Sequence, residues 1–248
     1  MKLESKHAAI TGGNSGIGLA IARAFRNEGA EVAILGRDGA TLKDAVAELG
    51  PGTVATQGDV SNLADLDRFY SEIDQAFSGL DLLVVNAGVY SASALDETTP
   101  EFFDRMSAVN FRGAFFTVQR ALPLLRESAS VILVTSTINE SGVPGLAVYA
   151  ATKAAVRSLA RGLAAELMPR KIRVNALSPG IIDTPIFGRL GMEDQQVEGL
   201  KSDLEGQVPM GRLGTPDEIA RAAVFLASDD SSYMTGCELP VSGGLGQI

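Results

Sequence analysis

The sequence predicts an α/β fold: a single domain over residues 1–248, with a doubly wound parallel sheet of about seven strands and helices on both faces. Short apolar runs alternate with longer segments of helical periodicity, which is the pattern of right-handed strand–helix–strand crossovers. A glycine-rich turn joins the first apolar run to the first helical segment. The 27 glycines and 46% hydrophobic residues suit close contact between helices and a buried sheet.

The elements follow in order along the chain. The predicted strands lie at 7–11, 31–35, 53–57, 81–86, 130–136, 172–178 and 237–241. The predicted helices lie near 16–28, 39–49, 62–77, 101–127, 147–168 and 215–227. Thr99 and Pro100 indicate an N-cap followed by proline at the first helical position, and residues 49–53 indicate a helix stop and a turn. The long segment 184–214 breaks the alternation, and we expect a substrate lid there because such excursions are usually functional.

Composition and charge exclude several classes of function. The formal net charge of −9 disfavours a nucleic-acid surface, which needs clustered Lys and Arg. The single cysteine, Cys237, excludes an intramolecular disulfide. The first residues lack an apolar signal region and no uncharged apolar run reaches membrane-spanning length, so we expect a cytoplasmic protein. The single histidine, His7, leaves no multi-histidine metal site, so we expect no metal and assign proton transfer to Tyr, Lys, Asp or Glu.

The first turn predicts a Rossmann-type dinucleotide site. Residues 8–25, AAITGGNSGIGLAIARAF, run through a strand, a glycine-rich turn and a helix. Glycines at the spacing of Gly12, Gly16 and Gly18 let the backbone approach a pyrophosphate, and the following helix offers its N-terminal N–H groups to the anion. We expect cofactor contacts from this turn, which also contains Asn14, Ser15 and Ile17.

Small and polar residues follow other predicted strands at the same edge of the sheet, where ligands of such folds bind. They are Asp59 and Val60 after the third strand, Asn86, Ala87 and Gly88 after the fourth, Ser136 at the end of the fifth, and Pro179, Gly180 and Thr184 after the sixth. Each has a structural alternative: Asp59 could cap the helix near residue 62, and residues 86–88 could form a plain turn. Their gathering at one edge favours a shared site.

A tyrosine and a lysine stand four residues apart in the helical segment 147–168. Tyr149 and Lys153 would therefore face the same way, and Ser136, thirteen residues before Tyr149, could converge with them. A free phenol has a pKa of about 10, and a nearby ammonium lowers it by stabilising the phenolate. The Ser136 hydroxyl could donate to a carbonyl oxygen on which negative charge develops. The alternative is a solvated helix surface with no chemistry.

Several segments together resemble the short-chain dehydrogenase/reductase family over about residues 6–243. They are TGGNSGIG, NAG, AVNFRG, Ser136 followed after thirteen residues by YAATK, RVNALSPG and IIDT. The chain is most similar to the bacterial NADP-dependent ketoreductases and alcohol dehydrogenases of that family. The resemblance implies hydride transfer between a nicotinamide cofactor and a carbonyl or secondary alcohol, and a homotetramer.

The resemblance also implies a role for each matching residue. Tyr149 would be the general acid in reduction and the base in oxidation, Lys153 would lower its pKa and hold the nicotinamide ribose, and Ser136 would orient the substrate carbonyl. Asn110 would hold a water for proton relay. Cofactor contacts would come from Asp59 and Val60 at the adenine, Asn86 in the strand-four turn, Ile182 and Thr184 at the carboxamide, and Tyr149 and Lys153 themselves. Ser242 departs from the acidic residue that the family usually has there.

The end of the second strand predicts a preference for NADP(H) over NAD(H). An NAD enzyme places a carboxylate there for the ribose hydroxyls. Here that position looks like Gly36, which leaves room for a 2′-phosphate, and Arg37 follows to bind it. Asn14 could add a hydrogen bond. The alternative is that Asp38 serves the ribose of NAD instead, or only caps a helix.

The substrate is less defined than the reaction. We expect an apolar ketone or secondary alcohol, because the lid carries the apolar residues Pro185, Ile186, Phe187, Leu190 and Met192. The alternatives are a 3-oxoacyl thioester reductase, a non-catalytic dinucleotide-sensing regulator, and a methyltransferase, which would need an acidic residue after the second strand. For the tetramer, the candidate interface residues on the two long helices are Phe115, Phe116, Leu159 and Leu163.

Overall fold

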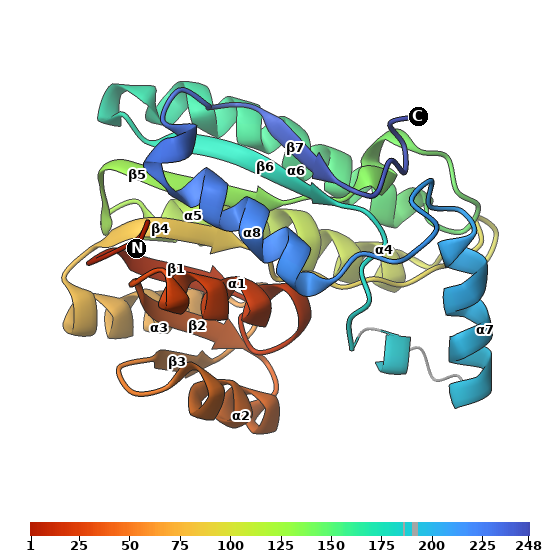
Figure 1. Ribbon diagram of the computed structural model, residues 1–248, viewed down its shortest axis with the longest axis horizontal. Helices are drawn as coiled ribbons and strands as arrows, with labels where there is room; N and C mark the ends of the chain where they lie inside the picture. The colour runs from red at the N-terminus through yellow and green to blue at the C-terminus, as the bar shows by residue number, and fades with distance from the viewer. Residues whose placement is uncertain (186, 190–192) are drawn as a thin grey trace.

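The computed structural model describes residues 1–185, 187–189 and 193–248, and these contain one seven-stranded sheet. The strands are β1 (His7–Thr11), β2 (Glu31–Gly36), β3 (Val54–Gln57), β4 (Leu80–Val85), β5 (Leu125–Val134), β6 (Arg173–Pro179) and β7 (Glu238–Val241). Their order across the sheet is β3-β2-β1-β4-β5-β6-β7, with every neighbouring pair parallel. The predicted doubly wound parallel sheet is therefore confirmed (Figure 1).

Helices cover both faces of this sheet (Figure 1). One face carries α1 (Gly16–Asn27), α2 (Gly39–Leu49) and α8 (Pro216–Ala227). The other carries α3 (Leu63–Phe77), α4 (Pro100–Ser107), α5 (Gly113–Ala121) and α6 (Ala147–Leu167). A further helix, α7 (Asp194–Glu205), stands beside the sheet rather than on it.

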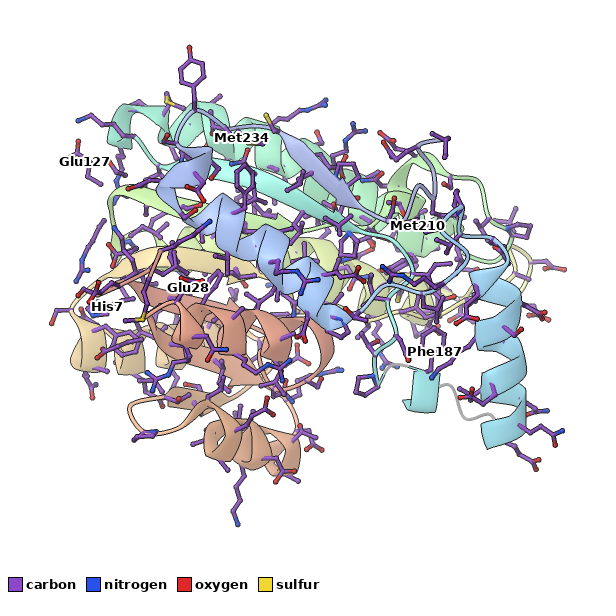
Figure 2. All side chains as sticks on the ribbon, in the orientation of Figure 1. His7, Glu28, Glu127, Phe187, Met210 and Met234 are labelled. Atoms are coloured by element: carbon purple, nitrogen blue, oxygen red, sulfur yellow. The ribbon has the colours of Figure 1, made fainter. Side chains whose placement is uncertain are left out.

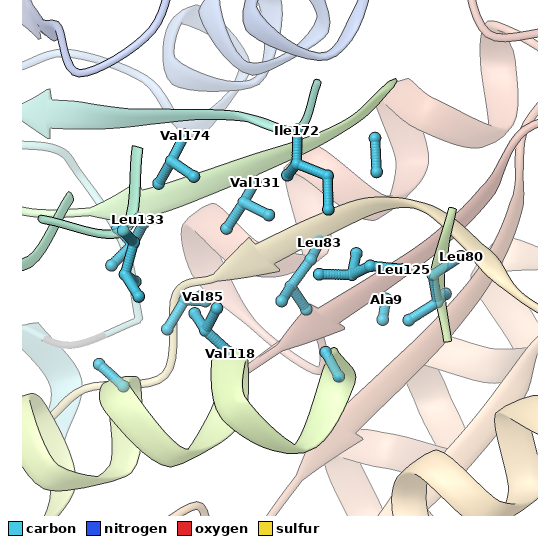
Figure 3. Packing of buried hydrophobic residues seen from close by; sticks show 14 of the residues in the cluster. Ala9, Leu80, Leu83, Val85, Val118, Leu125, Val131, Leu133, Ile172 and Val174 are labelled. Atoms are coloured by element: carbon cyan, nitrogen blue, oxygen red, sulfur yellow. The ribbon is translucent and has the colours of Figure 1, made fainter. Parts of the chain in front are cut away.

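The sheet is buried on both faces, so its central strands are apolar at consecutive positions. Leu83 and Val85 of β4 pack toward Val118 of α5 (Figure 3), whereas Leu82 and Val84 belong to the core on the α1–α8 face. Parallel strands covered on both sides give such continuous apolar runs rather than alternation. This explains why the strands were recognisable from short apolar segments.

The prediction of one continuous helix over residues 101–127 is wrong, because the helix is interrupted and ends earlier. It is divided into α4, a π-helical turn at Ala108–Arg112, and α5, which stops at Ala121. Pro123 has no N–H and its ring would clash with the carbonyl one turn earlier, so the helix cannot run on. The next strand therefore starts at Leu125, earlier than predicted, and ends at Val134, which leaves Ser136 just beyond it.

The segment 184–214 contains a helix that periodicity had not revealed. Glu193 and Gln196 form a reciprocal capping box at the start of α7, and a carboxylate followed three residues later by Gln is a signal that could have located it. Figure 2 shows Phe187 and Met210 on the side of the molecule that carries α7, at the opposite end from His7. Of the apolar residues predicted for the lid, Ile186, Leu190 and Met192 lie outside the described residues. No helix within the described ranges is long and apolar enough to cross a membrane.

Candidate active site

A cavity of about 730 Å³ opens at the carboxyl ends of β1, β2 and β4. The chain reverses direction across the sheet between β1 and β4, and ligands of doubly wound folds bind at that point. Most residues predicted to bind cofactor line this cavity: Gly12, Asn14, Ser15, Gly16, Ile17, Gly36, Arg37, Asp59, Val60, Asn86, Ala87, Gly88 and Thr184. Residues that the cofactor prediction did not include are Leu35, Asp38, Thr41, Gly58, Val109 and Pro185. The residue types of Leu35 and Gly58 do not predict a binding role, because these residues line the cavity only through their positions at strand ends.

The glycine-rich turn is shaped to let backbone approach the cavity. Gly12 has φ +66°, and its N–H donates to Leu35 O at 2.8 Å. A Cβ on Gly18 would lie 2.1 Å from Gly12 O, so only glycine lets α1 start this close to the turn. Gly18 therefore supports the turn from beneath and does not line the cavity.

The start of α1 suits an anion. Ser15 is its N-cap residue but makes no side-chain capping hydrogen bond, and its first turn holds no acidic residue. The N-terminal N–H groups of a helix carry partial positive charge and bind phosphate when no side chain satisfies them. This end of α1 borders the cavity at Gly16 and Ile17, so a dinucleotide pyrophosphate fits the site.

Asn86 braces the turn from the neighbouring strand. Its Nδ2 donates to Thr11 O at 3.0 Å and to Gly12 O at 3.2 Å, and its backbone N–H donates to Thr11 Oγ1. A Cβ on Gly12 would lie 2.9 Å from Asn86 Nδ2. The segment Asn86–Gly88 is thus more than a plain turn, because its first side chain holds the glycine-rich turn against β4.

The residues after β6 close the other side of the cavity. The Gly180 N–H donates to Val241 O at 3.0 Å, and Ile182 pairs with Gly214 in an isolated bridge. Thr184 lies opposite the glycine-rich turn, since a Cβ on Gly16 would be 3.5 Å from Thr184 Cβ. Thr184 therefore faces the cavity, whereas Pro179, Gly180 and Ile182 anchor the chain that leads to it and do not line it.

Ser136, Tyr149 and Lys153 converge as the sequence predicted. Ser136 caps a short 3-10 helix (Thr137–Glu140) after β5, and its side chain is near enough to the Tyr149 hydroxyl on α6 to act on the pKa of that phenol. Lys153 is buried one turn further along α6, where its Nζ donates to Val134 O at 3.0 Å and lies 5.9 Å from the centre of the Tyr149 ring. The ring of Tyr90 meets that of Tyr149 edge-on, with centroids 5.2 Å apart. Lys153 therefore does not lie on a solvated helix surface.

The pKa values of these groups differ from the simplest expectation. Burial raises the pKa of Tyr149 to about 12, with the hydrogen bond from Ser136 acting in the opposite direction and Tyr90 adding to the rise. Burial also lowers the pKa of Lys153 to about 8. In the chain alone, desolvation of the phenolate outweighs the other influences, so Lys153 by itself does not lower the Tyr149 pKa; the expected depression involved a positively charged nicotinamide ring as well.

The buried lysine should cost stability at neutral pH. The pKa of Lys153 is lower in the folded chain than in the unfolded chain, so between about pH 8 and 10.5 the unfolded chain binds more protons. The free energy of unfolding therefore rises with pH across that window. Below about pH 8 the folded protein carries the full cost of burying the charged lysine. We expect Lys153→Met to raise the free energy of unfolding of the cofactor-free protein by about 1–2 kcal/mol at pH 7, after the lost hydrogen bond to Val134 O is counted. Urea unfolding at pH 7 and pH 10 measures this, and a variant less stable than wild type at pH 7 would contradict it.

Asn110 lies in the π-helical turn, where an extra residue redirects side chains. Its Oδ1 accepts from the Val89 N–H at 2.8 Å, and its Nδ2 donates to Val89 O and to Thr152 Oγ1. A Cβ on Gly88 would lie 3.3 Å from Asn110 Oδ1 and 3.5 Å from Lys153 Nζ. Asn110 therefore lies near Lys153 with Gly88 beside them both. π-helical turns are frequent at functional sites, but sequence periodicity does not reveal them.

The sequence predicted open space above Gly36 at the end of β2, but that space is filled. A Cβ there would lie 2.4 Å from Asn14 Cγ, so the Asn14 carboxamide occupies that space, and its Nδ2 donates to Thr41 Oγ1 at 2.7 Å. Arg37 is half exposed at the cavity wall, with NH1 3.8 Å from Asp59 Oδ2. Asp38 accepts from the Thr41 N–H as the N-cap of α2, and Asn62 rather than Asp59 caps α3.

Comparison with known proteins decides the family. A model of the family described as enoyl-(acyl carrier protein) reductase matches residues 12–246. Oxidoreductase asL5 of Sarocladium schorii is 44% identical over 100% of this chain and 98% of its own length. The 2,5-dichloro-2,5-cyclohexadiene-1,4-diol dehydrogenase LinX of Sphingobium indicum is 37% identical over 98% of this chain and 97% of its own. The chain belongs to the short-chain dehydrogenase/reductase family.

A solved structure of the same family agrees. The glucose/ribitol dehydrogenase of Brucella melitensis, a short-chain dehydrogenase/reductase, superposes with a TM-score of 0.93 at 34% identity, covering 100% of this chain and 99% of that one. The members of this short-chain dehydrogenase/reductase family are oxidoreductases that use nicotinamide dinucleotide cofactors. Within the described ranges, no group of His, Cys, Asp or Glu is arranged to hold a metal ion.

Proposed function

We propose that this chain is an NADP(H)-dependent oxidoreductase that interconverts a carbonyl compound and a secondary alcohol, with Tyr149 as the general acid and base. The observation that carries the proposal is the convergence of Ser136, Tyr149 and Lys153. None of the three lines the dinucleotide cavity, but Lys153 Nζ lies next to Gly88 of the cavity wall, 3.5 Å from where a Cβ on Gly88 would be. The cofactor supplies or accepts the hydride. Tyr149 gives a proton to the carbonyl oxygen in reduction and removes it in oxidation, while the Ser136 hydroxyl orients that oxygen by donating to it.

Lys153 contributes charge and position. Its ammonium lies near the Tyr149 ring, so the phenolate that remains after proton donation is stabilised by a cation in a dry site. The high pKa of Tyr149 in the chain alone means that a second positive charge, that of an oxidised nicotinamide ring, is needed for it to act as a base near neutral pH. The same ammonium can donate to the nicotinamide ribose, and Asn110 beside it can hold a water that carries the proton to solvent.

We propose an apolar substrate of moderate size, closed in by the segment 184–214 as a lid. Phe187 and Val208 are buried within this segment, and Pro185 lies at the cavity wall. LinX, by its name, oxidises a cyclic secondary diol, which is consistent with a compact alcohol. The family description names a reductase of enoyl groups on acyl carrier protein. It shares the acyl thioester, but not the reduced bond, with the second candidate function, a 3-oxoacyl thioester reductase.

A panel assay tests the proposal. Purified protein is mixed with NADPH and cyclohexanone, acetophenone or a 3-oxoacyl thioester, or with NADP⁺ and cyclohexanol, and absorbance at the reduced nicotinamide band is followed. We expect turnover of an apolar ketone or its alcohol. Turnover of the thioester alone would favour the second candidate. Tight NADPH binding with no turnover of any compound would favour a dinucleotide-sensing regulator and overturn the enzyme proposal.

We also propose a homotetramer. Phe103, Phe111 and Phe115 on the α4–α5 segment are 52%, 40% and 38% exposed, which is unusual for aromatic side chains on a monomer surface. Of the predicted interface residues, Phe116 and Leu159 are partly buried against the chain's own core and Leu163 is 9% exposed, so Leu163 is excluded because its own chain already covers it.

The tetramer proposal has a direct test. Light scattering at micromolar concentration should give about four times the chain mass of 25.9 kDa. Phe115→Glu should shift this toward dimers or monomers, because a charge placed in an apolar interface is costly to bury. A stable monomer of the wild-type protein would contradict the proposal.

A further inference from the structure

An acidic side chain on the edge strand β7 contacts residues on both sides of Ser136. Glu238 Oε1 accepts from Thr135 Oγ1 at 2.9 Å and from Asn139 Nδ2 at 2.8 Å. The Asn139 N–H in turn donates to Ser136 O at 3.0 Å. The Glu238 side chain is only 12% exposed, so these bonds are shielded from water. One carboxylate oxygen thus ties together the end of β5 and the turn that presents the Ser136 hydroxyl.

The other oxygen of the same carboxylate is held by the helix that carries Tyr149. Tyr149, Lys153 and Arg157 follow at intervals of four along α6 and so lie on one stripe. Arg157 Nε lies 2.5 Å from Glu238 Oε2, and its NH1 lies 2.6 Å from Glu140 Oε1. Arg157 Nε has no aligned hydrogen-bond acceptor, so its contact with Glu238 is an ion pair rather than a directed hydrogen bond.

We propose that Glu238 and Arg157 are positioning residues for the reaction at Tyr149: Glu238 holds both sides of Ser136, and Arg157 fixes that carboxylate to the helix of Tyr149. The inference rests on the proposed function, since it assigns no chemistry to the pair itself. Its physical basis is that Ser136 and Tyr149 come from different elements, which Lys153 links before Ser136 through its hydrogen bond to Val134 O. Glu238 and Arg157 supply a second link, which reaches the turn after Ser136.

Glu238→Gln is the first test. An amide can keep an oxygen toward Thr135 and Asn139 or toward Arg157, but its N–H₂ group then meets a donor on the other side. We expect kcat to fall roughly tenfold, because misplacement of a reacting group by up to 1 Å costs as much as a hundredfold. The NADPH dissociation constant should not change, since neither residue lines the dinucleotide cavity.

The pH dependence of turnover distinguishes a positioning role of Glu238 from a role in stability alone. The hydrogen bond from Ser136 lowers the pKa of Tyr149, while Tyr90 from the loop after β4 raises it and Lys153 faces the same ring from α6. If Glu238→Gln loosens Ser136, the apparent pKa that governs alcohol oxidation should move upward. Arg157→Lys keeps the positive charge but loses the branched contact with two carboxylates, and we expect a smaller change in the same direction. That variant also keeps the test informative if Glu238→Gln does not fold.

Asp81→Asn is the matched control. Asp81 is 15% exposed and pairs with Arg126 NH1 at 2.8 Å at the opposite, amino edge of the sheet. We expect it to lower the unfolding temperature as Glu238→Gln does, but to leave kcat and the pH profile unchanged. Hydrogen–deuterium exchange gives a readout that needs no substrate: the backbone amides of residues 135–141 should exchange faster in Glu238→Gln and not in Asp81→Asn.

The outcomes distinguish this inference from the proposed function. If Ser136→Ala lowers kcat while Glu238→Gln leaves kcat, the pH profile and exchange at residues 135–141 as in wild type, the positioning role is overturned and the proposed function stands. If Ser136→Ala and Tyr149→Phe both leave turnover unchanged, the proposed function itself fails. A drop in unfolding temperature for Glu238→Gln with no change in the pH profile would assign the pair to stability alone and overturn the inference.

Discussion

Tyr149→Phe is expected to lower turnover by roughly 10²–10⁴-fold while NADPH binding survives, because loss of a positioned acid costs that much when water does not replace it. The phenyl ring fills the same space beside the Tyr90 ring and the Lys153 ammonium, so the site keeps its shape. What is lost is the proton at the hydroxyl that Ser136 contacts. Steady-state rates with the best compound of the panel, together with NADPH fluorescence titration, measure the two effects separately.

Tyr90→Phe provides the control for this variant. Tyr90 touches the Tyr149 ring edge-on and raises the pKa of Tyr149, but Ser136 acts on the Tyr149 hydroxyl and not on that of Tyr90, whose pKa is raised by burial. Removal of that hydroxyl should leave most of the rate. A Tyr149→Phe protein within a few-fold of wild type, or a Tyr90→Phe protein as inactive as Tyr149→Phe, would show that the proton comes from another group.

The fold was predictable because it depends on local signals that the chain repeats. A sheet buried on both faces makes each strand a short apolar run, and the glycines of the first turn are required by close approaches such as that of Gly18 to Gly12 O. The convergence of Ser136 with Tyr149 followed from strand-end position and helical spacing. Residue type and separation alone carry these signals, so the sequence is sufficient to predict them.

Other parts of the site depend on contacts between distant segments and left no such signal. Glu238 lies in a short edge strand 103 residues from its partner Thr135, and nothing near it in the sequence marks it as part of the site. The π-helical turn that places Asn110 is a local departure from helical periodicity. Glycine at position 36 suggested open space, whereas a side chain from another turn, Asn14, fills it. The Tyr149 pKa likewise depends on burial, which spacing does not report.

The proposed preference for NADP(H) rests on the charges at the end of β2. No carboxylate stands at Gly36, where an NAD enzyme would bind ribose hydroxyls, and a side chain there would collide with Asn14. Asp38 caps α2 by accepting from the Thr41 N–H, which suits a structural role for its carboxylate. Arg37 lies at the cavity wall with its guanidinium half exposed, and its one ion pair with a described residue is a long, 3.8 Å contact to Asp59. A 2′-phosphate on the adenosine ribose would therefore meet a cation that can reorient toward it.

We expect wild-type kcat/KM to favour NADPH over NADH by about tenfold to a hundredfold, since a charge-assisted contact to phosphate contributes roughly 1.5–3 kcal/mol. Arg37→Ala should remove most of that preference by weakening NADPH binding, with little change for NADH. Arg23→Ala is the control: Arg23 is an exposed arginine of α1 paired with Glu48 and Asp217, it does not line the cavity, and its loss should leave the cofactor ratio as it is. A wild-type preference for NADH, or a ratio that survives Arg37→Ala, would show that Asp38 or another group reads the ribose.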